Sequence, residues 1–180
     1  MFTEVKDNDI SILVNNVGIG TPTGKTILTN DPKDIENIIK TNIFSQVMMT
    51  KKFIEKVKQE RQNKTSLIIN LSSIVGDNYN PFGTAYYQGT KRFNRIFAKC
   101  IYYPTGVYSL VIKPGWVSTP LTGNRKVSWN TTSVQEETDS IIAAIGFTNE
   151  THAHPKHLLV NSLLSLLPMH AIMWYTKGKK

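Results

Sequence analysis

Three short apolar runs alternate along this chain with longer stretches of helical periodicity, and this alternation constrains the fold more than any other feature. The runs cover residues 10–14, 66–71 and 107–112. Apolar runs of this length, rich in β-branched residues and bounded by turns, indicate buried strands. Strands that alternate with helices form parallel sheets with helices packed against them. The sequence therefore predicts an α/β fold.

Two long helices are predicted between these strands. The first begins at Asp31 and Pro32, because an aspartate caps a helix and a proline fits its first turn. Apolar residues then recur at helical spacing, so one long or broken helix is expected as far as about Gln62. The second helix covers residues 86–101 and is basic, with Phe93 and neighbouring apolar residues on one side.

The net charge of the chain limits the classes of molecule that it is expected to bind. The chain carries 21 lysine and arginine residues against 13 acidic ones, a formal charge of +8. Such a charge suits a phosphate-bearing cofactor or an anionic membrane surface, or else it lies on solvated helix faces. We expect no nucleic-acid partner, since no aromatic platform or groove-reading motif accompanies the charge. Cys100 is the only cysteine, which excludes an internal disulfide bond and fits a reducing, intracellular compartment.

The C-terminal part differs from the rest in composition. Residues 158–175 contain no formally charged side chain, although polar residues interrupt the run. We therefore expect an α/β domain over residues 1–150 and an apolar helical segment over residues 151–180. The segment either lies at a membrane interface, at the endoplasmic reticulum or a mitochondrion, or packs against the domain or a partner. A membrane span is the least favoured alternative, because a clean span needs about 20 apolar residues.

Three histidines, His152, His154 and His157, lie close together in a polar connection before this segment. Closely spaced histidines can bind a metal ion, but no cysteine lies near them in the sequence. We therefore predict no metal site and expect the three side chains to lie in a solvated loop.

Residues suited to catalysis follow the three predicted strands in order. Asn-Asn-Val-Gly at residues 15–18 follows the first strand, Ser-Ser at residues 72–73 the second, and Pro-Gly-Trp-Val-Ser-Thr at residues 114–119 the third. Asn42 lies within the first long helix, and a Tyr-x-x-x-Lys motif at residues 87–91 opens the second. Open α/β sheets bind ligands outside the carboxyl ends of their strands. Each motif is weak alone, but together they predict a catalytic site.

In this order the motifs resemble those of the short-chain dehydrogenase/reductase family. The resemblance covers residues 10–119, and the Asn-Asn-Val-Gly sequence is more similar to the branch of 17-beta-hydroxysteroid dehydrogenases and very-long-chain 3-oxoacyl-CoA reductases. It implies that this chain forms the C-terminal part of a doubly wound, parallel-sheet Rossmann fold, with three to four strands and flanking helices. It also implies reduction of an apolar, lipid-like carbonyl substrate, 3-oxoacyl or hydroxysteroid-like, with NADP or NAD as the cofactor.

The residues suit that chemistry. Tyr87 would donate its phenolic proton to the carbonyl oxygen, and Lys91, one helical turn away on the same face, would favour the tyrosinate. Ser73 would hydrogen-bond the substrate oxygen and stabilise charge that develops there. The resemblance implies that Asn42 anchors a water that relays the proton outward, and that Lys91 also holds the nicotinamide ribose.

Two alternatives lie next to the assigned residues. Tyr86 has a threonine rather than a lysine four residues further on, so it lacks a positively charged neighbour on its helix face. Ser72 could replace Ser73, but adjacent strand residues point to opposite faces, and the family places the second serine in the site. The resemblance also assigns contacts with the cofactor, to Asn16, Gly18, Tyr87, Lys91, Pro114, Gly115, Val117 and Thr119.

One part of the family's pattern has no counterpart in this sequence. The family's fold begins with a strand and a glycine-rich turn that receives the cofactor pyrophosphate, and nothing before Ile10 matches that turn. We therefore expect this chain alone to bind NAD(P)(H) weakly. The strand that begins at Ile10 and ends at Val14 should then be an apolar edge, which a second chain or a missing N-terminal half would cover.

Two functions remain as hypotheses. The first is a carbonyl reductase whose N-terminal half is either lost from this sequence or supplied by a second chain. The second is a noncatalytic, dehydrogenase-derived subunit of a larger assembly. The presence of Asn42, Ser73, Tyr87 and Lys91 favours the first hypothesis. The missing glycine-rich turn favours the second.

Overall fold

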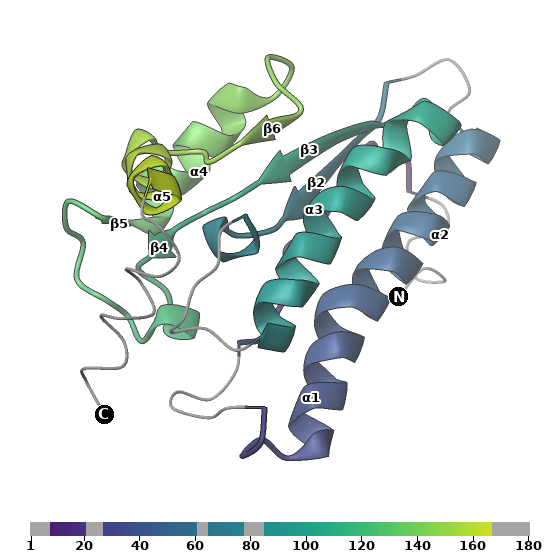
Figure 1. Cartoon of the computed structure of the whole chain (residues 1–180). Coiled ribbons are helices and arrows are strands. Elements are labelled where there is room, and N and C mark those ends of the chain that lie inside the picture. Colours follow the sequence, from purple (N-terminus) through teal and green to yellow (C-terminus); the bar gives the residue numbers. More distant parts are fainter. Residues whose placement is uncertain (1–7, 21–26, 61–64, 78–84, 167–180) are drawn as a thin grey trace, which may run out of the picture.

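A computed structural model describes residues 8–20, 27–60, 65–77 and 85–166. Its centre is a parallel sheet in the strand order β1-β2-β3-β6 (Figure 1). The strands are β1 (Ile12–Asn15), β2 (Leu67–Leu71), β3 (Tyr108–Ile112) and β6 (Glu150–Thr151). The first three are the strands that the apolar runs predict, so the predicted α/β fold is confirmed.

Helices cover both faces of this sheet. They are α1 (Pro32–Ile39), α2 (Ser45–Glu60), α3 (Ala85–Thr105), α4 (Val134–Ala144) and α5 (Pro155–Leu166). Figure 1 shows α2 and α3 side by side on one face, where Ile101 of α3 joins Ile68 of β2 in a buried cluster. On the other face, Ile141 of α4 packs against a cluster that contains Leu110 of β3. This arrangement has the layers expected of a doubly wound sheet.

The predicted first helix is broken, and the break contains a predicted site residue. A π-helical turn, η1 (Lys40–Phe44), joins α1 to α2 and includes Asn42. Single π turns inside α-helices occur frequently at functional sites. The predicted cap of α1 is confirmed, because the Asp31 side chain accepts a hydrogen bond of 2.8 Å from the backbone N–H of Lys33.

β1 lies at the edge of the sheet, and among the described strands it pairs with β2 alone. Its side chains Ile12 and Val14 are 50% and 54% exposed. They point to the same face, because strand side chains alternate. The described sheet therefore ends in an unpaired, apolar strand.

The C-terminal part continues the main fold. The expected boundary after residue 150 falls inside β6, which pairs with β3. A small parallel sheet of β4 (Trp116–Val117) and β5 (Thr131–Thr132), with the short 3₁₀ turn η3 (Pro120–Thr122), lies between β3 and α4 in the chain. Among the described helices, none has the length and apolar character needed to cross a bilayer. Residues 167–180 of the predicted apolar segment lie outside the described residues, so its contact with a membrane or partner stays a prediction.

Candidate active site

The predicted site residues gather at the carboxyl ends of β1, β2 and β3. Gly18 follows β1, Ser73 follows β2 and Pro114 follows β3. The N-terminal half of α3 runs beside this edge and adds Tyr87 and Lys91. Parallel strands end at one edge of a sheet, which explains why segments far apart in the sequence meet here.

Lys91 is buried beneath Tyr87. The Lys91 Nζ atom lies 5.9 Å from the centre of the Tyr87 ring and donates a hydrogen bond of 3.1 Å to the carbonyl oxygen of Leu71 at the end of β2. The residue is only 6% exposed, and this burial lowers the pKa of its amine to about 8. The i, i+4 spacing thus produces the predicted pair on one helix face.

Tyr87 holds its proton tightly in this structure. Burial raises the pKa of its phenol above the ordinary value. The expected lowering of this pKa by Lys91 is not found, because loss of solvent is the cause that sets the direction of the shift. Tyr87 is therefore a protonated phenol at neutral pH, which is the form that can donate a proton.

Asn42 connects the loop after β1 to α3. Its Oδ1 accepts a hydrogen bond of 2.8 Å from the N–H of Ile19, and its Nδ2 donates to the Ile19 carbonyl at 3.0 Å. The same Nδ2 donates to Thr90 Oγ1 at 3.1 Å, and Thr90 donates in turn to the carbonyl of Tyr87 at 2.8 Å. Asn42 is fully buried. Both of its amide hydrogens are used, so the structure gives it an anchoring role, and the water relay stays a prediction.

Gly18 lies against both of these residues. A Cβ atom at Gly18 would lie 3.3 Å from Lys91 Nζ and 3.5 Å from Asn42 Oδ1. Gly18 is therefore packed against the lysine amine, and a side chain at this position would crowd it. Asn16, the other predicted cofactor contact of this loop, is exposed.

The two serines after β2 have different surroundings. Ser72 is buried and donates a 2.7 Å hydrogen bond to the Lys91 carbonyl oxygen, so it fixes α3 to the sheet. Ser73 is half-buried, caps the 3₁₀ turn η2 (Ile74–Gly76), and makes a long 3.4 Å contact with the Pro114 carbonyl. Ser73 therefore has the freer hydroxyl. No hydrogen bond joins it to Tyr87 in the described part of the chain.

The segment after β3 holds the remaining predicted cofactor contacts. The carbonyl of Pro114 accepts a hydrogen bond of 3.1 Å from the N–H of Ile74, which ties this segment to η2. Val117 lies in β4, and Thr119 caps the turn η3. Gly115 packs directly against the ring of His157, since a Cβ there would lie 2.7 Å from His157 Cδ2.

The prediction that the three histidines are solvated was wrong for His157. This side chain is 0% exposed. Its Nδ1 lies 3.1 Å from Oε2 of Glu137 in α4, and its ring fills the space that Gly115 leaves. His152 and His154 are half-buried, and His152 Nε2 lies 3.8 Å from the carboxylate of Asp77.

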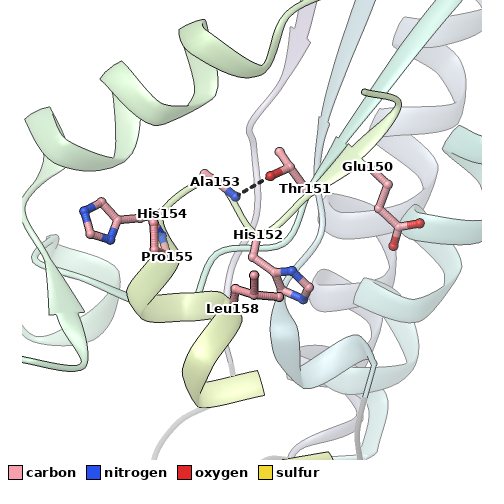
Figure 2. Close-up of a pocket in the computed structure, with 7 residues that line it drawn as sticks. All are labelled: Glu150, Thr151, His152, Ala153, His154, Pro155 and Leu158. Atoms are coloured by element: carbon pink, nitrogen blue, oxygen red, sulfur yellow. Dashed lines mark hydrogen bonds between the residues drawn. The ribbon is translucent and has the colours of Figure 1, made fainter. Parts of the chain in front are cut away.

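A shallow cavity lies near these histidines. Its volume is about 290 Å³, and it is lined by Glu150, Thr151, His152, Ala153, His154, Pro155 and Leu158. Figure 2 shows the rings of His152 and His154 pointing away from each other. No predicted site residue lines this cavity, so it is separate from the Tyr87 and Lys91 pair. Within the residues that the structure describes, no three potential metal ligands converge.

A buried polar network beneath the site was not predicted. The Nδ2 of Asn15 donates to Asn70 Oδ1 and to Thr50 Oγ1, both at 2.9 Å. Gln46 of α2 donates to the same Asn70 oxygen at 2.9 Å, and Asn70 donates to Ser109 at 3.0 Å. An asparagine inside the apolar run of β2 is the signal that would have indicated this network, because a buried amide needs partners.

Comparison with known sequences finds similarity over most of the chain. Residues 2–129 match the sequence profile of the short chain dehydrogenase family. The chain is 30% identical over 167 residues to the very-long-chain 3-oxoacyl-CoA reductase of Bos taurus, a match that covers 89% of this chain and 52% of that protein. It is 28% identical over 168 residues to 17-beta-hydroxysteroid dehydrogenase type 3 of Rattus norvegicus, covering 92% and 54%. The chain thus spans about half the length of these curated relatives.

Solved structures share the fold. A short chain dehydrogenase from Burkholderia cenocepacia, crystallised with NADP, has a TM-score of 0.74 at 20% identity, covering 91% of this chain and 68% of that one. The 3-ketoacyl-(acyl-carrier-protein) reductase of Brucella melitensis, complexed with NADH, has a TM-score of 0.71 at 19% identity, covering 82% and 67%. The predicted Rossmann-type fold is thereby confirmed. Together with the profile match, the shared fold and the ordered motifs show that this chain belongs to the short-chain dehydrogenase family.

Proposed function

We propose that this chain provides the catalytic residues of an NAD(P)(H)-dependent carbonyl reductase that acts on an apolar, lipid-like substrate. One observation carries the proposal: a protonated, partly buried tyrosine lies over a buried lysine at the carboxyl ends of three parallel strands. No observation in the described residues favours the alternative of a noncatalytic subunit.

The described residues fit a nicotinamide cofactor. Lys91 Nζ has three hydrogens and uses one for the Leu71 carbonyl, so it has donors left for ribose hydroxyls. Gly18 lies in close contact with this amine, where a side chain would crowd it. Lys91 and Gly18 would hold the ribose, and the segment of Gly115, Val117 and Thr119 would flank the nicotinamide. The bound cofactor would supply a hydride to the carbonyl carbon of the substrate.

Proton transfer would come from this chain's own side chains. Tyr87 Oη would give its proton to the carbonyl oxygen as negative charge develops there. Lys91, below the ring, would stabilise the tyrosinate that remains, because an ammonium favours a neighbouring anion. Ser73 would donate a hydrogen bond to the same substrate oxygen, since its hydroxyl makes only long contacts with the protein.

Two observations support an apolar substrate. Trp116 and Leu121, which follow β3, are 38% and 59% exposed, and Leu121 lies near the loop after β1, with its Cδ1 3.6 Å from where a Cβ on Gly20 would be. The curated relatives named above are reductases or dehydrogenases of 3-oxoacyl and hydroxysteroid compounds by their names. A 3-oxoacyl-CoA is therefore the first substrate to test.

The proposal includes a partner segment that pairs with β1. The exposed Ile12 and Val14 and the unpaired edge support it, because an apolar strand edge is stabilised by a further strand. This segment would also bring the glycine-rich turn for the cofactor pyrophosphate. It comes either from a second chain or from the same polypeptide.

The direct test is a chimera of this chain with the N-terminal half of the bovine 3-oxoacyl-CoA reductase. Tyr87→Phe keeps the ring and removes the proton, so reduction of a 3-oxoacyl-CoA should fall by about 10² to 10⁴. Tyr86→Phe is the matched control, and its turnover should stay close to that of the unmodified chimera. Oxidation of NADPH, followed spectroscopically, measures both. Equal losses in the two variants would show a packing defect rather than a lost proton donor.

A further inference from the structure

The buried histidine in α5 lies directly behind the segment that is expected to flank the nicotinamide. His157 is 0% exposed and lies 42 residues after Gly115 in the sequence. The position of a Cβ on Gly115 would lie 2.7 Å from Cδ2, 3.1 Å from Cγ and 3.3 Å from Nε2 of the imidazole. The ring and the backbone of Gly115 are therefore in van der Waals contact, with no room for a side chain between them.

The polar atoms of the ring extend this contact. His157 Nε2 lies 3.1 Å from the carbonyl oxygen of Trp116. A carbonyl oxygen can only accept, so Nε2 carries the hydrogen and donates it. On the opposite side of the ring, Nδ1 lies 3.1 Å from Oε2 of Glu137. This contact is not a hydrogen bond, so the donor bond of Nε2 and the packing against Gly115 orient the ring.

Glu137 is itself fixed to the small sheet. Its Oε2 accepts a hydrogen bond of 3.2 Å from Thr132 Oγ1 in β5, and the Thr132 carbonyl accepts the backbone N–H of Ser118 at 2.9 Å. An ion pair of 3.3 Å between Lys156 and Glu136 joins the starts of α5 and α4. The backbone of residues 115–118 is therefore held by α5, through His157, and by α4, through Glu137 and Thr132.

We propose that His157 is a positioning residue. It fixes the backbone of residues 115–119 in the position required for contact with the nicotinamide end of the cofactor. The inference rests on the proposed function, because this segment carries the predicted cofactor contacts Gly115, Val117 and Thr119. His157 would touch neither cofactor nor substrate and would act through the Trp116 carbonyl and the backbone of Gly115.

Two substitutions distinguish a side chain that keeps a donor at the position of Nε2 from one that does not. A glutamine can place its amide nitrogen near the position of Nε2, so His157→Gln keeps the donor to Trp116. An asparagine reaches only to the position of Nδ1, so His157→Asn loses the Trp116 bond. Both variants remove the ring and leave space beside Gly115, which makes them a matched pair.

The first measurement is hydrogen exchange of the purified chain, followed by mass spectrometry. In His157→Asn, peptides with residues 115–119 should exchange about tenfold faster than in His157→Gln, the effect of losing one buried hydrogen bond. Peptides from β2 should exchange equally in both. If His157→Asn exchanges fast throughout, Glu137→Gln takes its place, since it keeps the side-chain volume and alters only the contacts with Nδ1 and with Thr132 Oγ1. Equal exchange of residues 115–119 in all variants and the unmodified chain would overturn the proposal.

The second measurement uses the active chimera. His157→Asn should raise the KM for NADPH about tenfold with a smaller change in kcat, and His157→Gln should recover most of the loss. The same KM in both variants would overturn the positioning role even where exchange differs. An inactive chimera would instead contradict the proposed function, and the exchange comparison would then decide on His157 independently.

Discussion

The buried charge on Lys91 lowers the stability of the fold. Burial lowers the pKa of this amine from 10.5 to about 8, so between these pH values the unfolded chain binds the proton and the folded chain does not. The free energy of unfolding should therefore rise with pH across this window. The full difference corresponds to about 3 kcal/mol. Below pH 8 the cost is fully present, and near pH 10.5 it is gone.

Lys91→Met tests this argument, because methionine has similar length and no charge. At pH 7 the variant should be more stable than the unmodified chain by about 2 kcal/mol, after the loss of the bond to the Leu71 carbonyl. The advantage should disappear as the pH approaches 10.5. Urea unfolding of both proteins at several pH values gives the difference, in which the other lysines cancel. A difference that does not change with pH would contradict the assigned burial.

The adjacent serines allow a second test on single residues. Ser72 donates to the Lys91 carbonyl at 2.7 Å, so Ser72→Ala should lower the free energy of unfolding by about 1 kcal/mol. Ser73 makes only long contacts, so Ser73→Ala should have little effect on stability and should lower the kcat of the chimera by about 10². Thermal melting and steady-state kinetics measure the two effects. The reverse pattern would place Ser72 in the site.

Single elements show why some parts of this structure were predictable. Strands β1 to β3 come from short runs of apolar, β-branched residues that favour strands, and the cap of α1 depends on Asp31 and Pro32 alone. Tyr87 and Lys91 meet through the local geometry of one helix. Each of these features is determined within a few neighbouring residues, so the local pattern is sufficient.

Other parts depend on contacts that the local pattern does not contain. β6 has only two residues, both polar, and it forms because Glu150 meets Lys113 and α3. Asn42 was predicted as a site residue, but its partners Ile19 and Thr90 lie 23 and 48 residues away. His157 lies in a polar stretch, and its burial depends on the lack of a side chain at Gly115. Tertiary packing decides all three.

The ion pairs that hold β6 to the sheet give a prediction at this scale. Lys113 lies 2.7 Å from both Asp77 and Glu150 and is buried, whereas Lys99 contacts the same Glu150 at 2.6 Å with 42% of its side chain exposed. Burial raises the pKa of Glu150, but hydrogen bonds from Arg95 and the two lysines outweigh it and hold the pKa well below the ordinary value. Glu150 therefore stabilises the fold above its unfolded pKa and loses this effect as the pH falls.

Lys113→Met should destabilise the protein by about 2 kcal/mol or more at pH 7, because it leaves two poorly solvated carboxylates with one fewer partner. Lys99→Met, the control at the surface, should cost less than about 1 kcal/mol. The effect of Lys113→Met should shrink as the pH falls towards about 3, where the carboxylates become protonated in the unfolded chain. Urea unfolding at pH 7 and at acid pH provides the comparison. Equal losses in the free energy of unfolding for Lys113→Met and Lys99→Met would mean that burial of the ion pairs does not matter.

Within the part of the chain that the structure describes, the central sheet is covered by a helix towards its β6 end and unpaired at its β1 end. Ile141 of α4 packs against the core cluster of β2 and β3, whereas Ile12 and Val14 of β1 are about half exposed. An apolar, unpaired strand edge is a site of association. The purified chain should therefore form dimers or larger species, and its apparent size should increase with concentration.

Val14→Lys should increase the monomer fraction, because a charged side chain on an edge strand opposes pairing with another chain. Ile142→Lys is the control, since Ile142 is an apolar residue of α4 with a similar exposure, 61% against 54% for Val14, but does not lie on a strand. Size-exclusion chromatography with light scattering measures both variants over a range of concentrations. The control should associate like the unmodified chain. A monodisperse monomer of the unmodified chain with a cooperative thermal transition would show that β1 needs no covering strand, and the proposed partner segment would then have no role in stability.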